Sequence, residues 1–411
     1  MSATLSEREE ALLRRDWRLF SALTFLFSFG FAVYSGPFQN FLRDVLHAQA
    51  LDLGKLESLR EIPGLCAALM AGTLVALAEA RIAAVGLIVG AVGIAASGLC
   101  KTFPPLIAIT VFWSIGFHLW SSVQSAITLA LAKGKEGGRH LGRMSGIGAA
   151  ASIAGLGAAW LLSLAGTPYW GYFVVAGAAI FASGVLAELL STHSSGGARQ
   201  RIVVRREYGL YYLLMFLEGC RRQIFSIFAS FALILIYKVP VAQMLAVQLI
   251  NSVMIAFTAP WMGRVVDRKG ERGPLSFYAI ALIVVFAGYA CFENRYALIG
   301  LFLIDNVLFS FSVGFTTYLH RIVRPGELTP CLAMGVTMNH VAAVTVPFFG
   351  ALLWQATGNY HLPFWVGVGI SAVALVATRY LPKGAPPVHV DVPEYGSGAE
   401  EGVSPVIAEL P

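Results

Sequence analysis

The sequence predicts an all-α polytopic membrane protein with twelve transmembrane helices in two related six-helix bundles. Three observations support this fold class: the composition, the spacing of apolar stretches and an internal repeat. The 411-residue chain is 57% hydrophobic and only 13% charged. Because a water-soluble domain cannot bury so much apolar surface, we expect a lipid bilayer to cover much of the protein.

Apolar stretches long enough to cross about 30 Å of hydrocarbon recur along the chain. They lie at about 17–42, 51–79, 82–100, 104–132, 141–166, 168–190, 208–237, 241–263, 274–293, 296–319, 329–357 and 361–381. Pro37 is expected to break the outer half of the first of these helices.

The spans divide the chain into an N-terminal bundle at 17–190 and a C-terminal bundle at 208–381. A Ser/Gly- and then Arg-rich cytoplasmic linker is expected at 191–207. Residues 1–16 carry a capping-box pattern, which predicts a short amphipathic helix leading into the membrane. The tail at 382–411 is rich in Pro, Gly and acid, and we expect it to be disordered.

Basic residues predict the orientation. If both termini are cytoplasmic, the inner segments hold 21 of the Lys and Arg residues and the outer segments hold five. We therefore expect both termini in the cytoplasm, and the chain in a bacterial cytoplasmic (inner) membrane. Because the basic residues fall between apolar stretches rather than along one face, no nucleic-acid partner is expected.

The two halves repeat at an offset of about 190 residues. Met144-Ser145 aligns with Met334-Gly335, and Leu161-Leu162 aligns with Leu352-Leu353. Duplicated six-helix halves joined by a basic linker resemble the major facilitator superfamily. That resemblance implies two bundles that rock about a site near the middle of the membrane.

The loop after the eighth span carries the most specific resemblance. Residues 263–272 read GRVVDRKGER, which is similar to the superfamily signature G-x-x-x-D-R-x-G-[RK]-[RK]. The resemblance implies a conformational latch at the inner face, formed by Gly263, Asp267, Arg268, Gly270 and Arg272. The first-half counterpart at 72–81 has Ala76 in place of the acid, so we expect the latch to work mainly from the second half.

Polar side chains also lie where the spans cross the membrane. Ionisable groups are costly in lipid and therefore mark candidate pathways. The candidate substrate and coupling residues are Arg60, Glu61, His118, Gln124, Glu218, Arg221, Arg222, Asp305, Asn306 and His340. Gln248 and Asn251 are expected instead to satisfy hydrogen bonds between helices.

The seventh span holds the densest cluster. Arg221 and Arg222 lie near the bilayer midplane, one turn from Glu218. One arginine can pair with Glu218, and the other should point elsewhere, to another acid or into the cavity as an anion contact. Glu61, Glu218 and Asp305 are the candidate proton carriers. A purely structural ion-pair network is the alternative interpretation.

The predicted function is a secondary transporter that moves a small polar or anionic organic solute by alternating access, coupled to protons. No nucleotide-binding loop of the form G-x-x-x-x-G-K-[ST] occurs, so ATP is not expected to be the energy source. The fifth span has Ala159-Trp160 where proton antiporters of the superfamily carry Gly-Pro, which does not favour drug efflux. Efflux of amphipathic compounds by proton antiport and a transporter-like sensor or assembly factor remain the alternatives.

An enzyme would need convergent catalytic groups, and the sequence offers no such motif. No cofactor is expected, and no His, Asp or Glu cluster occurs at metal-ligand spacing. The expected partners are the lipid bilayer, a small-molecule substrate and protons, and the expected state is a monomer.

Overall fold

The computed structural model describes residues 7–66, 78–132, 137–191, 205–324 and 327–384. Over these ranges the chain is helical and contains no strand. The elements are α1 (Glu7–Asp44), α2 (Ala50–Leu65), α4 (Glu79–Ser97), α5 (Phe103–Ala132), α6 (Gly137–Leu164), α7 (Tyr169–Glu188), η1 (Arg206–Tyr208), α8 (Gly209–Gln223), η2 (Ile224–Ala229), α9 (Ser230–Leu235), α10 (Val241–Lys269), α11 (Arg272–Cys291), α12 (Arg295–Leu308), η3 (Phe309–Ser312), α13 (Val313–Ile322), α14 (Leu328–Thr357) and α15 (Leu362–Thr378).

Each predicted span is helical in the residues that the structure describes. Nine helices in the described ranges are long and apolar enough to cross a membrane. The other three predicted spans correspond to α2, which ends just before the undescribed residues 67–77, to the run from α8 to α9, and to the shorter α15. Much of the predicted linker, the predicted tail and Ala76 lie outside the described residues.

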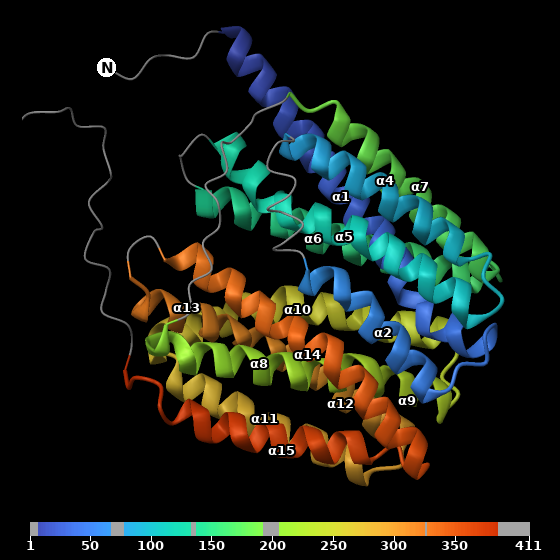
Figure 1. Cartoon of the computed structure of the whole chain (residues 1–411), viewed down its shortest axis with the longest axis vertical. Coiled ribbons are helices and arrows are strands. Elements are labelled where there is room, and N and C mark those ends of the chain that lie inside the picture. Colours follow the sequence, from blue (N-terminus) through green and yellow to red (C-terminus); the bar gives the residue numbers. More distant parts are fainter. Residues whose placement is uncertain (1–6, 67–77, 133–136, 192–204, 325–326, 385–411) are drawn as a thin grey trace, which may run out of the picture.

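The helices form two bundles that follow the two halves of the sequence. Figure 1 shows α1, α4, α5, α6 and α7 packed together above α8 to α15, with α2 lying against the lower group. Across the boundary, α2 packs against α14 and α6 packs against α10. Since α2 and α10 are the second spans of their halves, and α6 and α14 the fifth, the two cross-contacts are equivalent, as expected for related halves.

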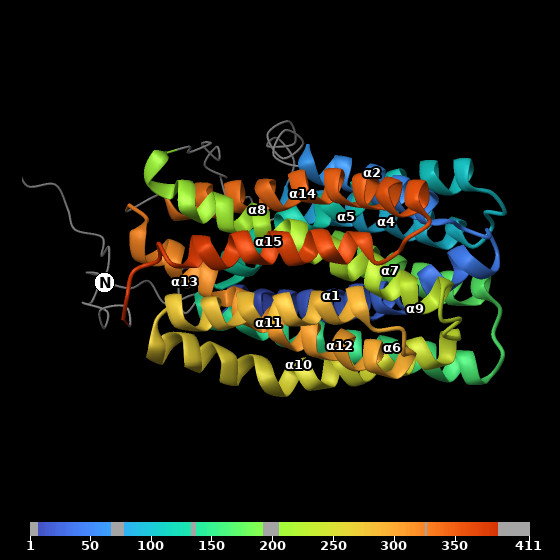
Figure 2. The same ribbon diagram turned by 90° about the horizontal axis from the view of Figure 1, so that it is seen from below.

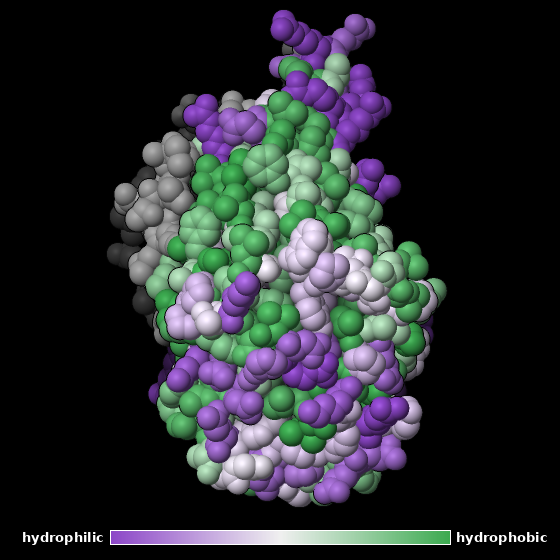
Figure 3. All heavy atoms as spheres, turned by 90° about the vertical axis from the view of Figure 1, so that its right-hand side faces the viewer, coloured by the Kyte–Doolittle hydropathy of each residue, from purple (hydrophilic) through white to green (hydrophobic). Residues whose placement is uncertain are grey.

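The start of α1 and the end of α15 lie at the same end of the bundle, as Figure 2 shows. We call this the terminal end and the opposite one the distal end. Large apolar side chains remain exposed on the sides between them, including Phe257 (78%), Val284 (63%) and Phe349 (63%). Figure 3 shows a broad hydrophobic area between hydrophilic residues at the top of the view and in its lower part. Such a belt fits an integral membrane protein.

Local sequence explains where several helices start and stop. The side-chain oxygen of Asn294 accepts hydrogen bonds from the backbone N–H groups of Tyr296 (2.9 Å) and Ala297 (3.2 Å), which caps the start of α12. Gly358 has φ of 67° and ends α14, and Gly270 has φ of 74° after α10. Glycine adopts these positive angles without a side-chain clash.

Helix α1 is continuous from Glu7 to Asp44, with Pro37 inside it. The prediction that Pro37 breaks this helix is therefore wrong. A neighbouring helix supplies a polar partner near the proline, because Gln248 of α10 donates a hydrogen bond from Nε2 to the backbone oxygen of Gly36 at 3.3 Å. The carbonyl that loses its helical donor to Pro37 is that of Val33, one turn earlier, so the bond from Gln248 adds a contact beside the proline and does not replace the lost one. The described residues before position 17 are the first turns of the same helix.

Two spans of the second bundle change their helical pitch. A π-helical segment, η2, follows α8 directly, and a 3₁₀ segment, η3, separates α12 from α13. Both changes come just after predicted site residues, Arg222 in one span and Asn306 in the other. Segments of this kind recur at functional sites in helical proteins.

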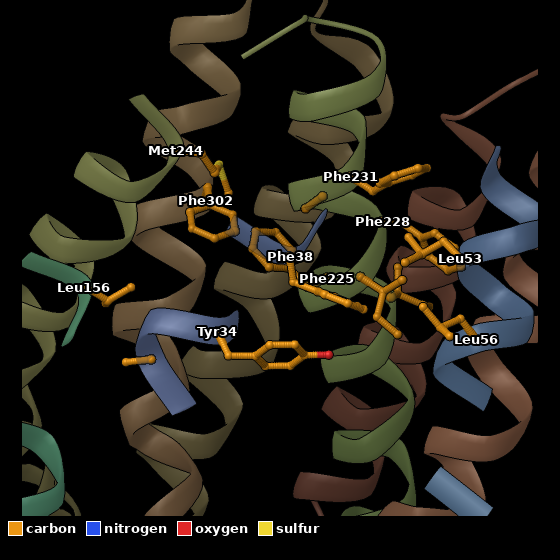
Figure 4. Close-up of a cluster of buried hydrophobic side chains, with 14 of the residues drawn as sticks. Tyr34, Phe38, Leu53, Leu56, Leu156, Phe225, Phe228, Phe231, Met244 and Phe302 are labelled. Atoms are coloured by element: carbon orange, nitrogen blue, oxygen red, sulfur yellow. The ribbon is translucent and has the colours of Figure 1, made fainter. Parts of the chain in front are cut away.

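Side chains from both bundles meet near the distal end. Figure 4 shows Tyr34 and Phe38 of α1 and Leu53 of α2 beside Phe225 and Phe228 of η2. These side chains are buried, and they belong to one apolar core that both bundles share. Dispersion and loss of water contact therefore hold the bundles together at this level.

Polar contacts also join the two bundles at the distal end. Arg43 of α1 donates to the backbone oxygen of Ile234 at 2.7 Å, and Asn40 donates to that of Val239 at 3.1 Å. The backbone N–H of Leu51 in α2 donates to Oε1 of Gln355 in α14 at 3.0 Å. The distal end is closed by contacts between the two bundles.

Candidate functional site

A cavity of about 250 Å³ lies between the two bundles, lined by α1, α6, α10 and α12. Its polar lining residues are Ser35, Ser152, Gln248, Asn251, Ser252 and Asn306. Its apolar lining residues are Phe31, Ala32, Leu156 and Phe302. The lining contains hydroxyl and amide groups and no charged side chain, so it matches a small polar ligand better than an ion.

The amides of this cavity differ in how far their hydrogen bonds are satisfied. Asn306 donates from Nδ2 to the backbone oxygen of Phe302 at 2.8 Å, and Gln248 is engaged by Gly36. Oδ1 of the buried Asn251 has no hydrogen-bond partner among the described residues. A buried acceptor is costly to leave unpaired, and a rotation of this amide toward the cavity would present Oδ1 to a ligand.

Gln248 and Asn251 were both expected to bond neighbouring helices. Gln248 does so through Gly36, and the structure places both amides on the cavity lining. An Asn or Gln in an apolar span has the same neighbours in the sequence whether it bonds another helix or lines a cavity. Only the position of α10 against the first bundle distinguishes them.

The polar cluster of α2 reaches the second bundle. Arg60 bonds Glu57 at 2.7 Å and Oε1 of Glu61 at 2.8 Å. The other oxygen of Glu61, Oε2, lies 3.1 Å from Nδ1 of His340 on α14. Glu61 and His340 therefore form a polar contact between the two bundles.

His118 of α5 completes this group. It is buried, and its ring centroid lies 5.1 Å from that of His340 with an angle of 74° between the ring planes. Three predicted site residues from α2, α5 and α14 thus come together at one place. Gln124, also on α5, does not join them. It is half-buried, its backbone oxygen accepts a hydrogen bond from Thr128 at 2.9 Å, and it does not line the cavity.

A second polar network lies inside the C-terminal bundle. Arg221 of α8 bonds Glu218 at 2.9 Å and Asp305 of α12 at 3.0 Å. The hydroxyl of Tyr278 donates to Glu218 at 3.0 Å. Exposed fractions of 3% for Arg221, 7% for Glu218 and 2% for Asp305 show that the network is buried. Arg221 is thus fully engaged by acids of its own bundle.

Arg222 has different surroundings. Its side chain is exposed, and its guanidinium carbon lies 5.2 Å from the centroid of the Phe309 ring. Among the described residues it forms no hydrogen bond or ion pair. The two neighbouring arginines diverge as their positions on a helix predicted, but Arg222 neither meets another acid nor lines the cavity.

The predicted latch loop is arranged around a different acid. Asp267 is exposed near the end of α10, and it forms no hydrogen bond or ion pair with described residues. Arg268 and Arg272 likewise form none within the described ranges, and no neighbour crowds Gly263. The buried acid is Glu271, 1% exposed, which pairs with Arg321 of α13 at 3.1 Å.

A further ion pair, which we call the terminal clasp, joins Arg205 and Glu327 at the terminal end. Arg205 pairs with Glu327 at 2.6 Å, and the hydroxyl of Tyr208 donates to Glu327 at 2.6 Å. The hydrogen bond from Arg205 holds the pKa of Glu327 below its usual range. This clasp ties the start of the C-terminal bundle to the start of α14.

Fold and site together define a helical membrane protein of two related bundles with a polar cavity between them. The family model of the Major Facilitator Superfamily matches residues 20–327, and the chain belongs to this superfamily of transporters. It is therefore a multi-pass integral membrane transporter, of a family whose members are not enzymes. A search of curated protein sequences found no match.

Solved structures share the fold at low sequence identity. The nucleoside transporter NupG is similar with a TM-score of 0.74 and 14% identity, over 88% of this chain and 98% of that one. A bacterial homologue of the iron transporter ferroportin, in an inward-facing state, gives 0.71 and 16% over 88% and 98%. The xylose transporter XylE from E. coli, in an inward-open conformation, gives 0.65 and 14% over 90% and 97%.

Proposed function

We propose that the chain is a secondary transporter that carries a small, uncharged, polar solute through the cavity between its bundles. The observation that carries the proposal is the lining itself. Hydroxyl and amide groups from both bundles surround the cavity, and the buried oxygen of Asn251 lacks a partner among the described residues. A hydroxylated solute can donate a hydrogen bond to that oxygen once the amide turns toward the cavity.

The anionic solute that the sequence also allowed has less support. Arg221 is engaged by two acids, and Arg222 is not among the residues that line the cavity. Two of the structural relatives, a nucleoside transporter and a xylose transporter, support the same solute class, because nucleosides and xylose are uncharged and rich in hydroxyl groups.

Alternating access is the mechanism that we propose for this movement. The cavity lies between the bundles, while hydrogen bonds such as those of Asn40 and Arg43 join them at the distal end. Opening the distal end would break these contacts, and new contacts at the terminal end would have to replace them. From the distribution of Lys and Arg we further infer that the terminal end faces the cytoplasm, in a bacterial inner membrane.

The first prediction tests the solute class. We expect ribonucleosides or pentoses to raise the melting temperature of the purified protein more than their phosphorylated counterparts, because a ligand at 100 times its Kd adds about 2.7 kcal/mol. Replacing Asn251 by Leu should weaken binding about tenfold, the value of one hydrogen bond. Gln124→Leu is the matched control, since this amide does not line the cavity. Stabilisation by the phosphorylated compounds alone, or a loss confined to Gln124→Leu, would contradict the proposal.

We propose protons as the coupling ion, held by the network of Glu218, Arg221 and Asp305. Two ionised acids and one arginine leave a net negative charge in a buried place. Such a charge is costly in the membrane, and one bound proton neutralises it. All three residues belong to the C-terminal bundle.

The second prediction tests this coupling. Glu218→Gln should still exchange solute across proteoliposome membranes but should no longer accumulate it when a proton gradient is imposed. Asp305→Asn should behave in the same way, because either change removes the need for the proton. Glu293→Gln, at an exposed loop position, is the control. Gradient-driven accumulation at the parental level in both network variants would rule out this proton site.

A further inference from the structure

We propose that Glu61, His118 and His340 form a binding site for a divalent transition-metal ion between the two bundles. Each residue offers one donor atom, and the three donor atoms lie within 4.8 Å of one another. Glu61 and His118 come from the N-terminal bundle, and His340 comes from the C-terminal bundle. The proposal concerns residues outside the polar cavity lining and does not depend on the identity of the solute.

The donor atoms are close to metal-binding distances. If all three pairs were separated by 4.8 Å, a point equidistant from the donors would lie about 2.8 Å from each. Zinc bonds to imidazole nitrogen and to carboxylate oxygen are about 2.0–2.2 Å long. Each donor therefore needs to move by less than about 1 Å, which side-chain rotation supplies.

Gly64 makes the room that this arrangement requires. A Cβ atom at position 64 would lie 2.4 Å from Cε1 of His340 and 2.5 Å from Cε1 of His118. Gly64 is one turn after Glu61 on α2, so it sits on the same face of the helix. Any larger residue at this position would push the two imidazole rings apart.

Neighbouring charged residues also orient the carboxylate of Glu61. Arg60 bonds Oε1 of Glu61, which orients the group and leaves Oε2 on the side of His340. Glu57, Arg60 and Glu61 together carry one net negative charge, which favours a cation. Charged partners that orient a ligand in this way support metal binding elsewhere.

The donor set selects the class of ion. Two imidazoles and one carboxylate suit Zn²⁺, Fe²⁺, Co²⁺ or Ni²⁺, whereas Mg²⁺ and Ca²⁺ prefer oxygen ligands alone. Three protein ligands leave further coordination positions open to water, so the ion can exchange. Because the ligands come from both bundles, a bound ion would hold α2 and α14 together and would slow any motion that separates them.

The test measures metal binding directly, on purified protein from which any affinity tag has been removed. Calorimetric titration with Zn²⁺ should show one saturable site per chain. Glu61→Gln, His118→Gln and His340→Gln should each weaken this site at least tenfold, and Gly64→Ala should weaken it by displacing the rings. His320→Gln is the control, since His320 is an exposed histidine at the terminal end. An excess of Mg²⁺ should not compete.

A second measurement needs no variant. Pulsed electron paramagnetic resonance of one bound Cu²⁺ per chain counts coordinated imidazoles, and we expect two. Absence of a saturable Zn²⁺ site, or retention of full affinity in well-folded His118 and His340 variants, would overturn the proposal. A Cu²⁺ spectrum without two coordinated imidazoles would overturn it too. Since no solute is present in these experiments, their outcome is independent of the proposed transport function.

Discussion

Arg221 and Arg222 are neighbours in α8, yet their guanidinium groups meet different surroundings. Arg221 lies between Glu218 and Asp305, while Arg222 is exposed and stacks against Phe309. Removing one partner from a buried ion network leaves an uncompensated charge. Arg222 has no ion-pair partner among the described residues, so its removal leaves no acid unpaired.

The third prediction follows from this contrast. Arg221→Gln should lower the free energy of unfolding by about 3–5 kcal/mol, because two carboxylates lose their shared partner. Arg222→Gln should change it by about 0.5 kcal/mol or less. Denaturant or thermal unfolding in detergent measures both. Equal effects of the two substitutions would show that the difference in surroundings has no energetic consequence.

The sequence could predict local pairs but not contacts between distant helices. The spacing on one helix predicted that Arg221 or Arg222 pairs with Glu218 but not which of the two, and the structure assigns the ion pair to Arg221. Nothing in the spacing indicates that Asp305 or Tyr278 joins them. The grouping of His118 with His340 likewise depends on how α5 and α14 pack, which no local pattern encodes.

At the scale of elements, the apolar stretches predicted helices well because membrane thickness fixes their length. They could not predict the π-helical η2 or the 3₁₀ η3, since both segments have the same apolar composition as regular helix. Pro37 shows the opposite error. A residue that breaks helices in water lies inside the continuous helix α1, so its type alone did not predict the local structure.

The loop between α10 and α11 gives the fourth prediction. Glu271 is buried against Arg321, whereas Asp267 is exposed and unpaired among the described residues. We therefore expect Glu271→Gln to lower stability, and Asp267→Asn to leave stability unchanged while slowing transport, because the latch role of Asp267 requires a different arrangement of the bundles. Melting curves and solute exchange rates distinguish the two effects. Parental exchange rates in Asp267→Asn would remove Asp267 from the mechanism.

For the whole molecule, the internal repeat and the signature loop were enough to predict two related bundles. The packing of α2 on α14 and of α6 on α10 is the structural counterpart of that repeat. The shape and lining of the cavity could not be predicted, because they depend on which faces of α1, α6, α10 and α12 meet. We propose that these bundles separate at the distal end during each transport cycle.

Crosslinking at the distal end tests this claim most directly. Leu51 and Gln355 are in contact there, so cysteines at both positions can be joined by a short, reducible crosslinker, with Cys66 and Cys291 replaced by serine. We predict that crosslinking abolishes solute exchange in proteoliposomes and that reduction restores it, while the two single-cysteine variants stay active throughout. Exchange at the full rate in the crosslinked protein would contradict alternating access between the bundles.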